Sequence, residues 1–252
     1  MYFPEWNLFN LTIAIISIAG SSLLIAREFS PATRLNYSKF NATSSSKSSE
    51  ISISSYNGML LIYTPSLILS TLFLVISYKN YRMLLISATI FVHYLKRVLE
   101  VMFVHRYSGQ CKLKDNTLIS MSYFIFALLV YKLASNVTDP SSRITLLGIT
   151  MFLMGEYTNF YHHLILRNLR KDGSKEYKVP SGALFNCIWC PHYMGEIISF
   201  IAMVLVTQHF LILILQLGSA GYLAIRAYNT KKWYTDKFGT IPSRACLIPY
   251  IF

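Results

Sequence analysis

The first residues that could do chemistry lie in an apolar stretch, HYLKRVLEVMFVHR, from His93 to Arg106. Within it Tyr94, Arg97 and Glu100 are spaced to share one face of a helix. Arg97 and Glu100 stand three residues apart and can neutralise each other. Ionisable groups are costly inside a membrane, so this pair either locks helix packing or serves a binding site. The sequence leaves both interpretations open.

A second polar cluster lies in GEYTNFYHHLILRNLR, residues 155–170. Asn159, His163, Arg167 and Arg170 recur at steps of four, four and three, which makes one polar stripe on an apolar helix. Arginine forks bind phosphates well, and an amide and an imidazole can hydrogen-bond a ligand deeper in. The alternative is a stripe that packs against another helix. We favour an anion site, because no acidic residue nearby could neutralise two arginines.

The stretch CIWCPHYMGEI holds Cys187 and Cys190 at C-x-x-C spacing, followed by a histidine. A structural zinc site needs four ligands, and the other cysteines, Cys111 and Cys246, lie far away in the sequence. A thioredoxin-like motif needs a βαβ context, which this sequence does not show. We therefore expect no metal, and we interpret both cysteines as small packing residues. Pro191 then begins a helix, and a helix N-terminus near arginines suits a pyrophosphate.

Long apolar segments must position these residues. Of the 252 residues 54% are hydrophobic and only 13% are charged, and crossing a bilayer takes about 20 apolar residues in a helix. We predict an all-α polytopic membrane protein of about seven transmembrane helices. The segments of sufficient length are Leu8–Ala26, Gly58–Ser77, Met83–Val104, Thr117–Ala134, Ile144–Leu166 and Met194–Ala227, the last of which we expect to break near 207–209.

The basic residues, which give a net charge of +12, stand in loops and at helix ends. This pattern indicates contact with membrane lipids and no nucleic-acid partner. Residues 27–57 are Ser-rich and are predicted to form a polar loop, in which Asn36 and Asn41 match the glycosylation pattern. The first segment has no basic leader and is interpreted as a retained helix. With no soluble-domain boundary, residues 1–252 are taken as one domain.

Several stretches together resemble the steroid 5α-reductase family, which includes very-long-chain trans-2-enoyl-CoA reductases and a polyprenol reductase. They are HYLKRVLEVMFVHRYSG, LILRNLRKDGSKEYKVPSGALF, CPHYMGEII, RAYNTKKWY and LIPYIF, within residues 93–109 and 155–252. The resemblance implies a multi-pass enzyme of the endoplasmic reticulum membrane. It also implies seven helices that enclose an NADPH and lipid-substrate cavity. Members reduce a C=C bond conjugated to a carbonyl or related group.

The resemblance also assigns roles to residues. It makes Tyr94 the tyrosine that binds the substrate carbonyl and acts as acid. We expect Tyr63 and Arg97 to be further substrate contacts. Tyr63 stands where steroid reductases have a glutamate, and its hydroxyl is a second candidate donor. The residues implicated in NADPH binding are Asn159, His163, Arg167, Arg170, Tyr177, His192, Glu196, Arg226, Tyr234 and Arg244.

Two further departures bear on the substrate. His192 replaces the usual asparagine of a Cys-Pro-Asn-Tyr motif, and His163 matches enoyl-CoA reductases, since steroid enzymes have aspartate there. The first expected substrate is a 3-oxo-Δ4-steroid, and the first alternative is a trans-2-enoyl-CoA of fatty-acid elongation. An inactive lipid-binding scaffold is the alternative of another class. The sequence does not indicate the oligomeric state.

Overall fold

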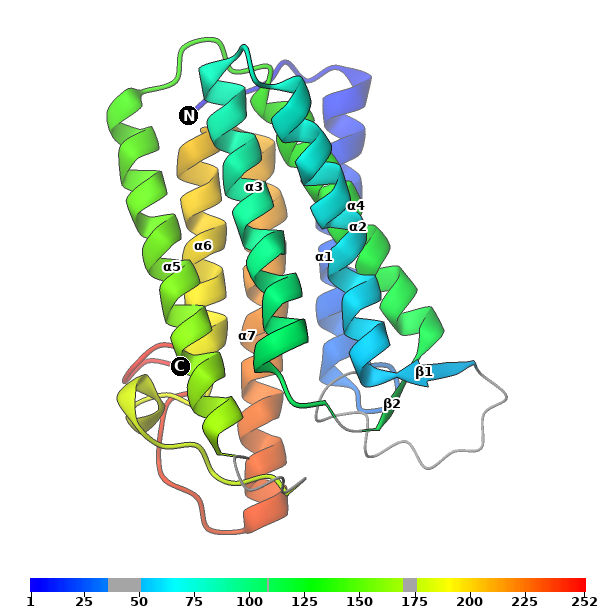
Figure 1. Cartoon of the computed structure of the whole chain (residues 1–252), viewed down its shortest axis with the longest axis vertical. Coiled ribbons are helices and arrows are strands. Elements are labelled where there is room, and N and C mark those ends of the chain that lie inside the picture. The colour runs from blue at the N-terminus through cyan, green and yellow to red at the C-terminus, as the bar shows by residue number, and fades with distance from the viewer. Residues whose placement is uncertain (36–50, 108, 170–175) are drawn as a thin grey trace. The chain divides into compact units, whose positions relative to one another are not determined.

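The computed structural model describes residues 1–35, 51–107, 109–169 and 176–252 of the chain. These residues form seven α-helices, one two-stranded sheet and short π and 3-10 segments (Figure 1). The helices are α1 (Leu8–Phe29), α2 (Ser55–Ile76), α3 (Tyr81–Leu99), α4 (Leu113–Ala134), α5 (Ser142–Asn168), α6 (Pro191–Thr207) and α7 (Phe210–Phe238). The strands are β1 (Ser52–Ser54) and β2 (Gln110–Lys112), and the π and 3-10 segments are Glu100–Val104 and Ala183–Asn186.

Four helices, α1, α2, α4 and α7, are long and apolar enough to cross a membrane by length and composition. The prediction of an all-α polytopic membrane protein is confirmed. Helices α3 and α5 carry the two charged clusters described above, and α6 is a shorter apolar helix of 17 residues.

Helix boundaries follow local capping chemistry. The side chains of Asn7, Ser54, Asn80 and Ser141 each accept a hydrogen bond from a backbone N–H of the first turn of α1, α2, α3 and α5. The predicted break near 207–209 is confirmed. Helix α6 ends at Thr207, and Gln208 takes the left-handed conformation with φ of 55° before α7 starts at Phe210.

The chain forms two compact units, residues 1–33 with 139–252, and residues 34–138. In the first unit α1 packs on α7, while α6 packs on both α5 and α7. Helices α5 and α6 approach closely because Gly155 and Gly195 have no side chains there. A Cβ at Gly195 would lie 2.6 Å from the Asn159 backbone nitrogen and 2.8 Å from the Gly155 carbonyl oxygen.

In the second unit α2 packs on α3 and α4. Strands β1 and β2 pair antiparallel, with Ile53 opposite Cys111. The predicted third span does not stay α-helical to its end, because α3 gives way at Glu100 to the π-helix. The predicted polar loop 27–57 is shorter than expected, since α1 continues to Phe29 and β1 and α2 include residues 52–57. Asn36 and Asn41 lie outside the described residues.

Candidate active site

The Arg97 guanidinium joins two predicted site residues in the second unit. Its Nη1 donates to Glu100 Oε2 at 2.6 Å, and its Nη2 donates to the Tyr63 hydroxyl oxygen at 2.5 Å. The guanidinium carbon also lies 4.7 Å from the centre of the Tyr63 ring. All three side chains are buried. The predicted pairing of Arg97 with Glu100 is therefore confirmed, and the same arginine reaches the tyrosine from α2.

Tyr94 lies in the same group of aromatic residues. Its hydroxyl donates to the backbone carbonyl of Tyr123 at 3.2 Å. The Tyr123 ring stacks on Tyr63, with centroids 5.7 Å apart, and is tilted against Tyr94 at 6.2 Å. Tyr63 and Tyr94, which come from α2 and α3, thus share one aromatic neighbour on α4. The structure brings together Tyr63, Tyr94 and Arg97, the three residues expected at the substrate.

Tyr107 belongs to this region, although no sequence motif singled it out. Burial raises the pKa of its phenol, and the charges of Arg97 and Glu100 act on it in opposite directions. Its hydroxyl lies 2.9 Å from His105 Nδ1. Tyr107 is therefore a neutral hydrogen-bonding group at ordinary pH. It follows the π-helix, so helical spacing could not have placed it there.

In the first unit, the polar stripe of α5 meets the start of α6. Asn159 Nδ2 donates to the His192 backbone carbonyl at 2.8 Å, and the His163 and His192 rings lie 5.4 Å apart. The close packing of Gly155 and Gly195 sets the distance between these helices. Three predicted cofactor residues, Asn159, His163 and His192, are thus neighbours, and all three are buried.

Three other predicted cofactor residues, Tyr177, Tyr234 and Arg244, border a row of aromatic rings. The Tyr177 ring meets Trp233 edge-on at 4.7 Å, and Tyr234 stacks on Trp189 at 5.0 Å. The Arg244 guanidinium carbon lies 5.2 Å from the Trp189 ring centre, and Arg244 Nη1 donates to the Pro180 carbonyl oxygen at 2.7 Å. Cations and aromatic faces therefore stand together at this end of the first unit.

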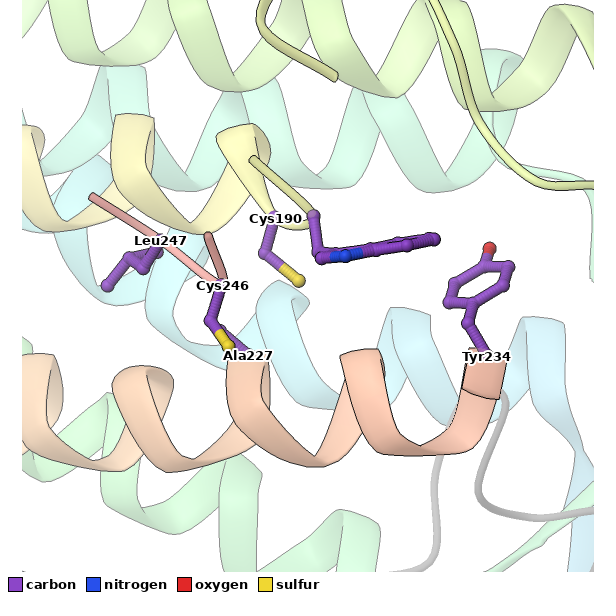
Figure 2. Packing of buried hydrophobic residues seen from close by; sticks show 6 residues of the cluster. Cys190, Ala227, Tyr234, Cys246 and Leu247 are labelled. Carbon is purple, nitrogen blue, oxygen red and sulfur yellow. The ribbon is translucent and has the colours of Figure 1, made fainter. Parts of the chain in front are cut away.

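The C-terminal segment holds this row in place by pairing with the chain before α6. The Trp189 backbone N–H donates to the Ala245 carbonyl at 2.9 Å, and that of Cys190 donates to the Cys246 carbonyl at 3.1 Å. Figure 2 shows Cys190 and Cys246 close together above α7, which carries Tyr234. Residues far apart in the sequence thus form one small core.

The two cysteines of the C-x-x-C stretch have different environments. Cys190 is fully buried in this core, as expected of a packing residue. Cys187 is exposed, so its interpretation as a packing residue is wrong. It caps the end of the 3-10 turn, where its backbone N–H donates to the Leu184 carbonyl, and its side chain lies outside the core. Pro191 begins α6, as predicted.

Arg226 has an acidic partner that no sequence motif indicated. Its Nη1 donates to Glu28 Oε2 at 2.9 Å, and neither side chain is exposed. Asn229 Nδ2 donates to the Glu28 backbone carbonyl at 2.7 Å. The ion pair joins α1 to α7 across nearly the whole sequence, so no local spacing could have indicated it.

Three predicted cofactor residues remain. Arg167 is exposed in the last turn of α5, and Glu196 is half-buried on α6. Arg170 lies outside the described residues. Among the groups that the structure does bring together, aromatic faces are able to stack on a ligand's rings and an arginine is able to bind a phosphate.

Comparison with known proteins places the chain in a family. The sequence profile described as 3-oxo-5-alpha-steroid 4-dehydrogenase matches residues 115–252, more than half of the chain. The chain belongs to this family. It is 33% identical over 205 residues to a very-long-chain enoyl-CoA reductase of Dictyostelium discoideum, with 79% of this chain and 68% of that protein covered.

Two other relatives match the chain over very different lengths. The 3-oxo-5-alpha-steroid 4-dehydrogenase 2 of Sus scrofa is 37% identical over 107 residues, which cover 42% of each chain. The polyprenal reductase of Saccharomyces cerevisiae is 26% identical over 246 residues, 94% of each chain. The match thus spans less than half the length of the steroid enzyme. The expected class, an oxidoreductase that acts on CH–CH groups of lipids, is confirmed by these reductases.

Proposed function

We propose that this family member uses NADPH to reduce a C=C bond conjugated to a carbonyl in a lipid, with a 3-oxo-Δ4-steroid as first substrate. One observation carries the proposal. Buried Arg97 donates to the hydroxyl of buried Tyr63, whose ring shares the neighbour Tyr123 with Tyr94. Hydride addition to the carbon β to a carbonyl leaves negative charge on the carbonyl oxygen, and hydroxyl donors fixed by a buried cation stabilise such charge.

The residues of the second unit bind and orient the carbonyl in this proposal. Tyr63 and Tyr94 present hydroxyls from two different helices, and Arg97 adds positive charge. Packing of the tyrosine rings excludes water, which strengthens each of these interactions. The apolar helices are suited to a lipid that enters from the bilayer.

The residues of the first unit bind the cofactor in this proposal. Asn159, His163 and His192 would hydrogen-bond the cofactor, while Tyr177, Tyr234 and Arg244 would hold its rings and phosphates. Arg167, Arg170, Glu196 and Arg226 complete the proposed set. The nicotinamide supplies the hydride when it is bound. We place the enzyme in the endoplasmic reticulum membrane.

A trans-2-enoyl-CoA is the second candidate substrate. The supporting observation is the match to the Dictyostelium enoyl-CoA reductase, which covers more of both chains than the match to the pig steroid enzyme. His163 also favours an enoyl-CoA substrate, because the enoyl-CoA reductases that this chain resembles have a histidine at that position. A CoA substrate needs a further cationic surface for its phosphates, beyond the cofactor's own.

The test is to incubate purified protein in detergent or nanodiscs with NADPH and a panel of substrates. The panel contains 3-oxo-Δ4-steroids, trans-2-enoyl-CoAs of several chain lengths and a polyprenal, and loss of NADPH absorbance is followed. We expect turnover with the steroids and a saturated product by mass spectrometry. If only the enoyl-CoAs are reduced, the substrate is an enoyl-CoA and the steroid proposal is wrong. If the protein binds the lipids but does not bind NADPH, the inactive lipid-binding scaffold is the correct alternative.

A further inference from the structure

We propose that Tyr63, polarised by Arg97 and with Glu100 as the positioning residue of that arginine, is the acid that protonates the substrate. Tyr94 then turns its hydroxyl from the Tyr123 carbonyl to the substrate and orients the substrate carbonyl without giving up its proton. The inference rests on the proposed function and names the proton donor of that same site. It also gives a role to Glu100, which no comparison or motif assigns.

The direction of the hydrogen bonds separates the two tyrosines. A phenol has one proton to donate and an oxygen that accepts. The Tyr94 hydroxyl donates that proton to the Tyr123 backbone carbonyl, a neutral acceptor. The Tyr63 oxygen instead accepts a charge-assisted bond from Arg97 Nη2 at 2.5 Å. Any negative charge that appears on the Tyr63 oxygen therefore faces a guanidinium, so Tyr63 is the better acid of the two.

Glu100 fixes the guanidinium in this position. Its Oε2 accepts from Arg97 Nη1 at 2.6 Å, which leaves Nη2 directed at Tyr63. Arginine presents its donors in a rigid plane, so anchoring one nitrogen orients the other. Glu100 is also the first residue of the π-helix, and its carbonyl accepts from the His105 N–H at 2.8 Å. π-Helical turns of this kind often occur at functional sites.

The proton transfer balances with the proposed reduction. When bound, a nicotinamide cofactor would supply the hydride, two electrons with one hydrogen, for the β-carbon, and the substrate C=C pair would then become an enolate. The O–H bond of Tyr63 breaks and its proton goes to the enolate oxygen. The resulting enol becomes the ketone by proton exchange with water. The Tyr63 phenolate, stabilised by Arg97, takes a proton from water, so that one solvent proton is consumed per turnover.

The experiment compares variants at four positions in steady-state kinetics on the best substrate of the panel. Tyr63→Phe should lower kcat about 100- to 1000-fold, the usual effect of removing one donor to a developing oxyanion. Tyr94→Phe should act mainly on KM, with a loss in kcat below about tenfold. Arg97→Lys keeps the charge but not the planar fork, and should lower kcat with little change in KM. Glu100→Gln should lower kcat in the same sense, and Glu100→Asp should restore part of the loss.

A second readout needs no turnover. The protein is labelled with 3-fluorotyrosine at position 63, and its 19F resonance is recorded without substrate. Arg97→Lys and Glu100→Gln should move this resonance, whereas Lys79→Gln should leave it in place. Lys79 is the control because it is an exposed cation of the same unit, and its Nζ lies over the Tyr78 ring, 5.3 Å from the ring centre.

The outcomes separate the two proposals. Active wild-type protein whose Tyr63→Phe variant keeps its kcat, while Tyr94→Phe loses it, overturns the inference and leaves the proposed function intact. A 19F resonance that has the same chemical shift in wild type, Arg97→Lys and Glu100→Gln also overturns the inference. Wild-type protein that oxidises no NADPH with any substrate refutes the proposed function and the donor role together, even if the resonance moves.

Discussion

Ser120 on α4 donates its hydroxyl hydrogen to the backbone carbonyl of Leu61 on α2, at 2.7 Å. In a regular helix that carbonyl accepts from the N–H four residues later, but this position is Pro65, which has no N–H. The serine therefore replaces the donor that the proline removes. Pro65 and Ser120 also line a hollow with Met121, Phe124 and Ile125. Tyr63 stands between Leu61 and Pro65, so this contact sets the local geometry of a proposed site residue.

Replacing Ser120 with alanine should leave the Leu61 carbonyl without its donor. A buried polar group that loses its partner costs about 1–3 kcal/mol of the free energy of unfolding. We expect a lower midpoint of thermal unfolding in detergent. Ser122→Ala is the control, because Ser122 bonds the carbonyl of Ile119 in its own helix and its loss should change stability by less than about 0.5 kcal/mol. If Ser120→Ala and Ser122→Ala change the unfolding midpoint equally, the hydrogen bond from Ser120 to the Leu61 carbonyl does not stabilise the protein.

The ion pair of Glu28 with Arg226 should be a major contributor to the packing of α1 on α7. Glu28→Gln leaves a buried guanidinium without its counter-charge, which typically costs about 3–5 kcal/mol. Urea or thermal unfolding measures the loss, with exposed Glu5→Gln as the charge-matched control that should be nearly neutral. Unfolding midpoints that do not differ between the variants contradict a structural role for the pair.

The contact of α5 with α6 should not tolerate a methyl group at Gly195. In Gly195→Ala the new carbon would lie 2.6 Å from backbone, so the helices must separate, at a cost of about 1–3 kcal/mol. Because Asn159 and His192 meet across this contact, NADPH affinity should fall as well. Gly20→Ala is the control. A methyl group at Gly20 would meet no neighbouring side chain within 4 Å, and alanine there should be neutral or stabilising by about 0.5–1 kcal/mol. A stable Gly195→Ala protein with full cofactor affinity is the contrary result.

Native protein treated with a maleimide or iodoacetamide should be modified first at Cys187. Of the four cysteines it alone is exposed, while Cys111, Cys190 and Cys246 are buried. Burial also raises the pKa of the Cys246 thiol, which lowers its reactive thiolate fraction at a given pH. Mass spectrometry of peptides after short labelling measures the order. The Cys187→Ser variant should take up little reagent until it is unfolded, and rapid labelling of Cys246 in folded protein speaks against this packing.

Local features could be predicted from the sequence because they depend on neighbouring residues. The break at Gln208 follows from the excessive length of one apolar run, and the Arg97–Glu100 pair follows from helical spacing. The partners of Arg226 and Tyr94 could not be predicted in this way. Glu28 lies 198 residues from Arg226, and Tyr123 lies 29 residues from Tyr94 on another helix.

The incorrect prediction that Cys187 is a packing residue has a related cause. The sequence treats Cys187 and Cys190 as equivalent members of one spacing motif. In the folded chain the C-terminal segment pairs beside residues 188–190 and covers Cys190, whereas Cys187 lies just before that pairing and stays outside the core. A tertiary contact from the far end of the chain decides which cysteine is buried.

Hydride transfer from NADPH to the carbon β to the substrate carbonyl is the central claim, and isotope transfer measures it directly. Purified protein is incubated with NADPH deuterated at C4 of the nicotinamide and a 3-oxo-Δ4-steroid, and the product is analysed by mass spectrometry and deuterium NMR. We expect one deuterium per product molecule, located at the former β-carbon. Parallel reactions in heavy water with ordinary NADPH should instead label the α-carbon. Unlabelled product, or deuterium on the carbonyl carbon of an alcohol, would contradict the reduction of a conjugated C=C bond by this enzyme.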